Sequence, residues 1–320
     1  MASLPGAIAR VSRKEGRTIM ALVRRMVFFA LRWSFLPWLH SLWRQRGKIT
    51  ILLYHDIPPE AFSRHLAHIE RHYALVSLGQ YLEAAAQGRP LGREKYLVVT
   101  FDDGLRGNFA LRELFARHPG KVTLYLCSAI VGTRRGFWFL TENLDSGPLK
   151  RVSNAARLTA LERVGFRQEA ECPARQALSD EEVLGLAAVA DIGSHTRFHP
   201  CLPCCQDDEA AGEIAGSREE LETRYHLRVR TLSYPNGDYC DRDIAQAKAA
   251  GYAAGITVDH GVNDQHTDPF RLRRISVNDT TDINEFIVKA SGLWGALTGV
   301  FVPPRHGRRP DPSPRKPPCA

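Results

Sequence analysis

Short apolar runs alternate with helical stretches along most of this 320-residue chain. The runs have the length and composition of strands, and each is followed by a segment with helical composition. This alternation predicts an α/β fold on a parallel sheet, because a helix must carry the chain back between parallel strands. The expected strands are 49–57, 95–101, 121–127, 189–196, 229–235, 253–258 and 271–277.

The number of strand–helix units, about seven, favours closure of the sheet into a distorted (β/α)7 barrel over an open sheet. In barrels of this type the chemistry lies at the C-terminal ends of the strands. The expected helices are 60–72, 77–87, 108–118, 155–170, 179–189, 207–226, 241–251 and 282–292. The histidine of "VDHG", His260, is expected in a loop.

Two adjacent carboxylates end the second expected strand, in the stretch "VVTFDDGLRGN" from Val98 to Asn108. Neighbouring residues on a regular strand point to opposite faces, so Asp102 and Asp103 can serve one site only if the chain bends. Gly104 follows at once and permits such a bend. The alternative is a solvated turn.

His195 and His199 lie four residues apart in "SHTRFHP". On one helical turn they would face the same way, which is a metal-ligand spacing. The pattern alone is weak, because paired surface histidines are common. Together with an acid at the end of another strand, two imidazoles and one carboxylate make a three-ligand site with an open position, as in catalytic zinc sites. Zn²⁺ is the default ion, although this ligand set also accepts Fe, Co or Ni.

The basic excess of the chain belongs to its two ends. Residues 1–47 carry nine Lys or Arg against Glu15, and 301–320 carry five against Asp311. With a total net charge of +8, the segment 48–300 is therefore left at about −4. Basic ends on an acidic middle argue against a nucleic-acid-binding domain and fit a membrane surface.

The chain's seven cysteines are odd in number and do not have the spacing of a disulfide framework, which favours a reducing compartment. "CLPCC" at 201–205 contains one C-x-x-C pair, but a zinc ribbon needs a second. We therefore interpret the cysteines as structural or incidental. The positions are Cys127, Cys172, Cys201, Cys204, Cys205, Cys240 and Cys319.

Residues 18–43 form a long apolar stretch that Arg24, Arg25 and Arg32 interrupt. A central Arg costs about 2.5–3.5 kcal/mol on insertion scales, so these residues argue against a clean membrane span. No secretory signal pattern is present. Arginines among tryptophans and aliphatics are typical of an interfacial helix on anionic lipid, which Pro37 would end or kink. The alternative is an ordinary amphipathic helix packed on the domain.

Three parts of the chain are therefore expected. Residues 1–47 form a basic, aromatic segment at the membrane interface, 48–300 form the catalytic domain, and 301–320 form a Pro/Arg-rich disordered tail. A reducing compartment and an anionic lipid surface together indicate the cytoplasmic face of a bacterial inner membrane.

The motifs together resemble a known family. "TFDDG" and "SHTRFHP" are similar to the first two motifs of the NodB-type polysaccharide deacetylases, carbohydrate esterase family 4. "LLYHDI", "LSYPNGDY" and "DPFRLRRISV" resemble the branch with the poly-N-acetylglucosamine deacetylases, and the likeness covers about 49–280. It implies a barrel of the NodB homology type and a metal-dependent hydrolase that removes N-acetyl groups from an amino-sugar glycan or a lipid-linked sugar.

The resemblance also implies roles for the individual residues. Asp103, His195 and His199 would hold the ion, and Asp102 would be the base that takes a proton from the water on the metal. The backbone N–H of Tyr234 would stabilise the oxyanion.

Two motifs depart from the family pattern. The third motif has no Arg to orient the base, and Arg274 would replace it. The late Leu-x-His motif is missing, and His55 would serve as the general acid, as in the branch that this sequence resembles. For His55 the alternative is a buried strand histidine bonded to backbone.

Two other functions stay open on the same residues. One is a non-catalytic glycan- or membrane-binding protein on this fold, since fold does not fix function. The other is a metal-dependent hydrolase of a different amide or ester. The complete metal set and the two acid–base candidates argue against a non-catalytic protein.

Overall fold

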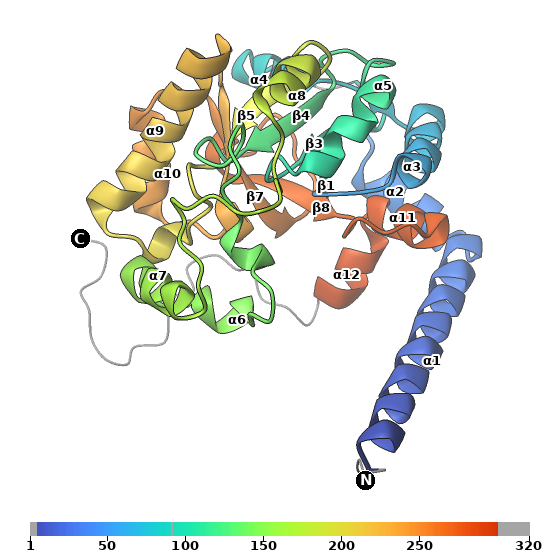
Figure 1. Cartoon of the computed structure of the whole chain (residues 1–320). Helices are drawn as coiled ribbons and strands as arrows, with labels where there is room; N and C mark the ends of the chain where they lie inside the picture. The colour runs from blue at the N-terminus through green and yellow to red at the C-terminus, as the bar shows by residue number, and fades with distance from the viewer. Residues whose placement is uncertain (1–4, 91, 300–320) are drawn as a thin grey trace.

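The sheet closes into a barrel of parallel strands. The computed structural model describes residues 5–90 and 92–299, with side chains from Ile19 onward. In this part of the chain β1 pairs with β3 on one side and with β8 on the other, and β4 to β7 complete the ring (Figure 1). The two-residue β2 pairs with the first two residues of β3, and β4 pairs with the last three. The strands are β1 (Ile49–Tyr54), β2 (Ala74–Leu75), β3 (Tyr96–Phe101), β4 (Val122–Leu126), β5 (Asp191–Ser194), β6 (Thr231–Ser233), β7 (Ala254–His260) and β8 (Leu272–Ser276).

Helices follow the strands and cover the outside of the barrel (Figure 1). Several begin with a capping box, including α4 at Ser77 and α8 at Ser179, where the cap side chain and the third helical residue satisfy each other's backbone N–H groups. The helices are α1 (Pro5–Trp33), α2 (Leu36–Arg44), α3 (Pro59–His72), α4 (Leu78–Ala86), α5 (Arg112–Phe115), α6 (Ser146–Leu149), α7 (Asn154–Arg163), α8 (Asp180–Ala187), α9 (Asp207–Tyr225), α10 (Asp241–Ala249), α11 (Ile283–Ala290) and α12 (Leu293–Gly299).

The predicted distorted (β/α)7 barrel is confirmed, and every expected strand is present. Most strands are shorter than expected, whereas β7 runs two residues past its expected end. Two local predictions were wrong. Residues 106–111 form a 3₁₀ helix, and only 112–115 of the expected helix 108–118 is α-helical. His260 is the last residue of β7 and not part of a loop. The expected tail, 301–320, lies outside the described residues.

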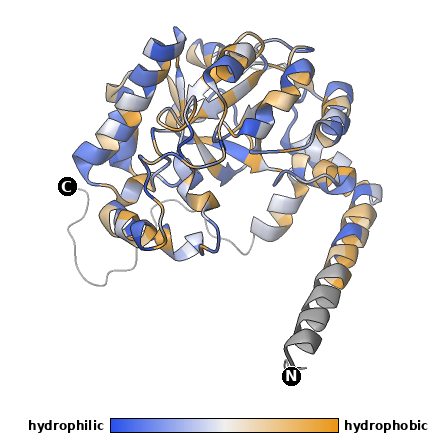
Figure 2. Cartoon of the chain, viewed as in Figure 1, coloured by the Kyte–Doolittle hydropathy of each residue, from blue (hydrophilic) through white to orange (hydrophobic). Residues whose placement is uncertain are grey.

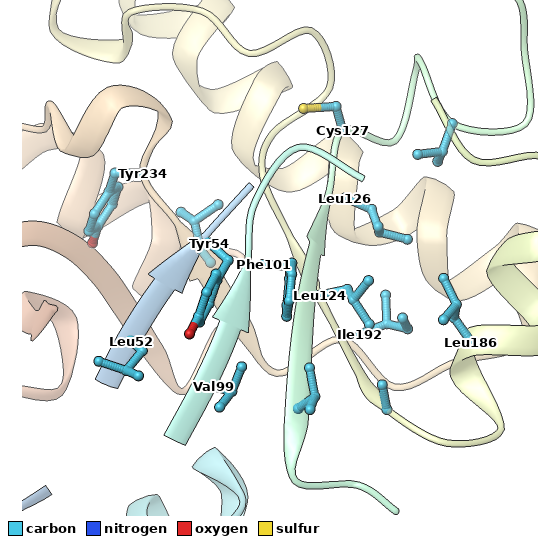
Figure 3. Close-up of a cluster of buried hydrophobic side chains, with 14 of the residues drawn as sticks. Leu52, Tyr54, Val99, Phe101, Leu124, Leu126, Cys127, Leu186, Ile192 and Tyr234 are labelled. Atoms are coloured by element: carbon cyan, nitrogen blue, oxygen red, sulfur yellow. The ribbon is translucent and has the colours of Figure 1, made fainter. Parts of the chain in front are cut away.

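Alternate residues of each strand face two different cores, because side chains on a strand have a period of two. Ile49, Ile51 and Val98 pack with Ile256 and Leu272 inside the barrel, where α4 covers them. The residues between them face the helices, and Figure 3 shows this outer layer on β1, β3 and β4. It includes Leu52, Tyr54, Val99, Phe101, Leu124 and Leu126.

The N-terminal segment consists of two helices. Phe35, with φ of 60°, separates α1 from α2, and Pro37 lies in the first turn of α2, where its missing N–H leaves no bond unmade. Phe28 is 2% exposed and packs with Val288, Leu293 and the ring of Trp294, which lies 4.7 Å away. This part of α1 is therefore docked on the barrel domain.

Two arginines on the same face of α1 also bind α11. Arg24 donates to Glu285 of α11 at 2.5 Å, and Arg32 donates to Asn284 at 2.8 Å. Residues 24, 28 and 32 are spaced by four and so lie on one helical face. From Ile19 onward, most other apolar side chains of α1 are exposed, among them Met20 (74%) and Met26 (63%). Figure 2 shows the hydrophobic residues along this part of the helix. No helix in the described residues has both the length and the apolar composition that crossing a membrane requires.

We predict that Phe28→Ala releases α1 from α11, because the buried ring is the apolar centre of this small contact and large-to-small core changes cost about 3–5 kcal/mol. Hydrogen exchange of residues 19–33 should become faster, while the melting temperature of the barrel changes little. Phe29→Ala is the matched control, since the Phe29 ring is 57% exposed. Equal exchange in the two variants would contradict the docking described above.

Candidate active site

The chain bends at the acid pair, as predicted. Asp102 continues the inward register of Val98 and Thr100 on β3, whereas the next residue would point outward on a regular strand. Asp103 (φ 76°) and Gly104 (φ 77°) both adopt the left-handed conformation, which ends the strand and turns the second carboxylate back. Both acids reach the same imidazole: His195 Nε2 lies 3.4 Å from Asp103 Oδ1 and 3.8 Å from Asp102 Oδ2.

Asp102 forms a buried bidentate ion pair with Arg274 of β8. The guanidinium donates to both carboxylate oxygens, at 2.8 and 2.7 Å, and its remaining N–H groups reach Thr100 Oγ1, Ser233 Oγ and the Thr257 carbonyl. Burial would raise the pKa of Asp102, but the Arg274 charge outweighs it and holds the pKa well below its usual value. The predicted partnership of Arg274 with Asp102 is therefore present, and Asp102 is kept ionised.

The two histidines lie in the loop that follows β5, and not on the single helical turn that their spacing of four would also allow. Thr196 (φ 64°) and His199 (φ 58°) are both left-handed, and these two bends bring the imidazole of His199 beside that of His195, with ring centroids 4.8 Å apart. Glu213 of α9 accepts the N–H groups of Arg197 and Phe198 at 2.8 and 2.9 Å. The backbone between the two histidines is thus fixed by a carboxylate of α9.

The donors of Asp103, His195 and His199 match the spacing of a metal site. The Nε2 atoms of the histidines lie 3.4 and 3.5 Å from Asp103 Oδ1, too far for good hydrogen bonds. Ligands at about 2.1 Å around a tetrahedral ion would lie about 3.4 Å apart. Asp103 Oδ1 is buried and has no hydrogen-bond partner. Such an oxygen is costly unless a cation compensates it, so the residues fit a divalent ion.

The protonation of the two imidazoles also suits metal binding. His195 Nδ1 lies 2.7 Å from the Ser233 carbonyl, so it carries the proton and leaves Nε2 free as a ligand. Burial lowers the pKa of His199 to about 3, so this imidazole is neutral at physiological pH. Burial acts against ionisation of Asp103 too, but the neighbouring imidazoles of His195 and His199 outweigh it and hold its pKa below the usual value.

His55 follows β1 and lies at the same end of the barrel. Its N–H donates to Asp279 Oδ1 at 2.8 Å, and its Nδ1 lies 3.3 Å from Asp279 Oδ2. The side chain is 41% exposed, so it is not the buried, backbone-bonded histidine of the alternative interpretation. Burial alone would lower the pKa of His55. The bond to Asp279 and the charges of the acid pair outweigh burial and raise this pKa to about 9.

Tyr234 does not have the geometry that its predicted role needs. Its backbone N–H donates to the Ile256 carbonyl at 3.0 Å within the sheet, and its hydroxyl donates to the Phe270 carbonyl. An N–H that is already bonded in a strand is not free to stabilise an oxyanion. The predicted contribution of Tyr234 does not fit this arrangement.

Sequence reasoning missed three residues that position the site. Ser233 bonds Asp102, Asp279 bonds His55, and Glu213 bonds the backbone between the two histidines. The signal for Ser233 was its place at the C-terminal end of an expected strand. Asp279 follows the last strand, with Asn278 and Asp279 both left-handed (φ 54° and 47°). Glu213 lies inside a helix, and nothing in the sequence marks it. The half-buried ring of Phe139 also lies 4.7 Å from the His199 ring and forms part of this site.

Comparison with known proteins decides the family. The sequence matches the family described as polysaccharide deacetylase over residues 91–255, just over half of the chain. This chain belongs to the polysaccharide deacetylase family. The family's enzymes are hydrolases of the amide bond in N-acetyl groups. The matched range contains Asp102, Asp103, His195 and His199, whereas His55 and Arg274 lie outside it.

Relatives cover most of the chain. YxkH of Bacillus subtilis (strain 168), which carries the family's name, is 22% identical over 267 residues, 80% of this chain and 76% of that protein. The deacetylase PplD of Streptococcus pyogenes, solved with acetate, has a TM-score of 0.56 at 18% identity over 77% of this chain and 99% of its own. IcaB from Ammonifex degensii has a TM-score of 0.55 at 17% identity over 78% of this chain and 98% of its own. At these identities the structures support the fold.

We predict that the two adjacent acids separate in function. Asp103→Asn and His199→Ala should lose the divalent ion, because each removes one of three donors, whereas Asp102→Asn should keep it and lose turnover by about 10²–10⁴-fold. Metal content and acetate release measured on the same preparations give both values. His266→Ala, in a surface loop, is the control for histidine loss. Loss of metal from Asp102→Asn would contradict these roles.

We predict that Arg274→Met destabilises the fold by about 3–5 kcal/mol at neutral pH, because it leaves the Asp102 carboxylate buried and unpaired. In the wild type the folded pKa of Asp102 lies below the unfolded value, so the pair stabilises above about pH 3.9 and less below it. In the variant, burial raises that pKa, and protonation relieves the penalty as the pH falls. The difference in melting temperature between the wild type and Arg274→Met should therefore become smaller toward about pH 4.

Arg273→Met is the matched control, because Arg273 is the exposed neighbour on the same strand. It should melt close to the wild type at every pH. A gap for Arg274→Met that stays constant with pH would show that the ionisation of Asp102 is not involved.

Proposed function

We propose that this chain is a metal-dependent deacetylase that removes N-acetyl groups from an amino-sugar glycan or from a lipid-linked amino sugar. The observation that carries the proposal is the orphaned Asp103 Oδ1 within 3.5 Å of two histidine nitrogens, beside a carboxylate that Arg274 keeps ionised. Zn²⁺ is the expected ion. When bound, it supplies Lewis acidity, which polarises the acetyl carbonyl and lowers the pKa of water.

The chain's own residues supply the proton transfers. Asp102 accepts a proton from the attacking water, and the guanidinium of Arg274 and the hydroxyl of Ser233 fix its orientation. His55, kept protonated at neutral pH by Asp279, gives a proton to the nitrogen of the leaving amine. The two groups thus hold opposite protonation states at the same pH, as a base and an acid must.

The test is acetate release by the full-length, zinc-loaded protein. We expect release from one of three substrate classes: N-acetylglucosamine oligomers, peptidoglycan fragments, or N-acetylglucosamine on a lipid phosphate. Asp102→Asn in the same preparation controls for contaminating enzymes. A metal-loaded wild type that releases no acetate from any class would overturn the proposal. A non-catalytic binding protein or a hydrolase of another amide or ester would then fit the site.

We also propose that residues 18–43 bind the cytoplasmic face of a bacterial inner membrane without crossing it. Trp33, Trp38 and Trp43 are 61%, 56% and 80% exposed, and water is a poor environment for such rings. Two of the arginines that interrupt the apolar stretch, Arg24 and Arg32, turn toward α11 and leave the outer surface less polar. The basic excess of residues 1–47 favours anionic lipid, by about 1 kcal/mol for each charge near the surface.

We predict that the full-length protein floats with anionic liposomes at low salt, and that Trp33→Glu/Trp43→Glu abolishes flotation, because it replaces apolar contact by repelled charge. Val164→Glu/Leu184→Glu is the matched control. It also places two charges on exposed apolar positions, 53% and 51% exposed, but elsewhere on the barrel. If neither the wild type nor this control floats, α1 serves only to pack on the domain.

A further inference from the structure

A groove of about 520 Å³ separates α1 from the loop that joins β8 to α11. Its size falls within the range of about 300–1,000 Å³ that is usual for small-molecule sites. One wall comes from the helix that we propose to lie on the membrane, and the other from the loop that follows the last barrel strand. The lining residues are Arg25, Met26, Phe29, Ala30, Thr281, Asp282 and Asn284.

The α1 wall of the groove is apolar and continues along the helix in both directions. Leu22 lies one turn before Met26, and Trp33 lies one turn after Phe29, with the Phe29 and Trp33 rings 6.4 Å apart. Leu22 is 60% exposed and Trp33 is 61% exposed. An apolar chain seated in the groove would therefore stay in contact with apolar side chains as it leaves toward the bilayer.

The opposite wall is polar and leads to the catalytic end of the barrel. Thr281 and Asp282 are two and three residues from Asp279, whose carboxylate binds the backbone and ring of His55. Arg64 of α3 donates to the Thr281 carbonyl at 3.2 Å. The polar wall of the groove and the residue that binds the proposed acid thus belong to one short loop.

The charge around the groove is positive. Arg25 lines it, Arg64 and Arg32 bond its polar wall, and Asp282 is engaged as the N-cap of α11, where its carboxylate accepts the Asn284 N–H at 2.8 Å. Three arginines, Arg25, Arg32 and Arg64, therefore line the groove or bond its polar wall against one lining carboxylate, Asp282, a net charge of +2.

We infer that this groove binds the lipid part of a lipid-linked amino sugar, with a single apolar chain along α1 and its phosphate among the arginines. The inference rests on the proposed deacetylase function and selects among its substrate classes. A free glycan would need neither an apolar wall nor a positive rim, whereas a lipid phosphate uses both. The sugar would then extend along the 279–282 loop toward His55.

The first experiment measures lipid binding without catalysis. Full-length Asp102→Asn protein in detergent micelles is irradiated with a polyprenyl phosphate that carries a diazirine at the chain end, and cross-links are mapped by mass spectrometry. We expect them within 22–33 or 281–284, with a yield about tenfold lower when Ala30→Trp fills the groove. Val27→Trp is the matched control, because Val27 does not line the groove and is 43% exposed. Cross-links elsewhere, or equal yields in the two variants, would overturn the inference.

The second experiment uses turnover and separates this inference from the proposed function. We compare kcat/KM for N-acetylglucosamine on a polyprenyl phosphate with kcat/KM for a soluble oligomer. Ala30→Trp should lower the ratio of the two about tenfold, and Val27→Trp should keep the wild-type ratio. If both variants act on the lipid-linked sugar like the wild type, the groove assignment fails and the deacetylase stands. If no preparation releases acetate, the function fails, and the cross-linking result still decides the groove.

Discussion

The bidentate pair between Arg274 and Asp102 crosses the interior of the barrel. Arg274 lies on β8 and Asp102 ends β3, and β1 stands between these strands in the sheet. The ladder between β1 and β8 has only two paired positions, Leu52 with Ile275 and Leu53 with Ser276. The ion pair therefore joins two strands that lie on either side of β1, next to a ladder in which the backbone pairing is short. Closure of the barrel and placement of the base depend on the same contact.

A buried ion pair is weak evidence for stability, because apolar residues of similar size often serve a core equally well. Its retention here has a chemical reason. Ser233 donates to Asp102 through its hydroxyl and accepts from His195 through its carbonyl, so a single residue of β6 orients both the proposed base and a proposed metal ligand. Apolar substitutes for Arg274 and Asp102 would fill the space but remove the base. The polar centre of the barrel is thus explained by the site and not by packing.

The sequence allowed the barrel, the bend at the acid pair and the grouping of Asp103 with the two histidines to be predicted, because each depends on local pattern and on strand ends that meet at one face. It did not allow the conformation of the ligand loop to be predicted. The spacing of His195 and His199 is helical, but Glu213 on α9 captures the N–H groups between them and stabilises two left-handed residues instead. Contacts of this kind depend on how distant elements pack, which no local pattern encodes.

The sequence also does not tell where the charged side chains of the N-terminal helix turn in the fold. In the sequence, Arg24 and Arg32 both count against contact with lipid, because each is a cation within an apolar stretch. In the fold, both turn to α11 beside Phe28, where Arg24 pairs with the carboxylate of Glu285 and Arg32 donates to the amide oxygen of Asn284. Between residues 19 and 33, α1 therefore presents outward mainly apolar side chains, with Arg25 at the groove and Arg24 paired at its edge. A helix attached by its own polar seam also has a fixed direction relative to the barrel. Lipid contact with the free face would then hold the loop of Asp279 at a constant orientation to the bilayer, and a site for membrane-borne substrates needs that constancy.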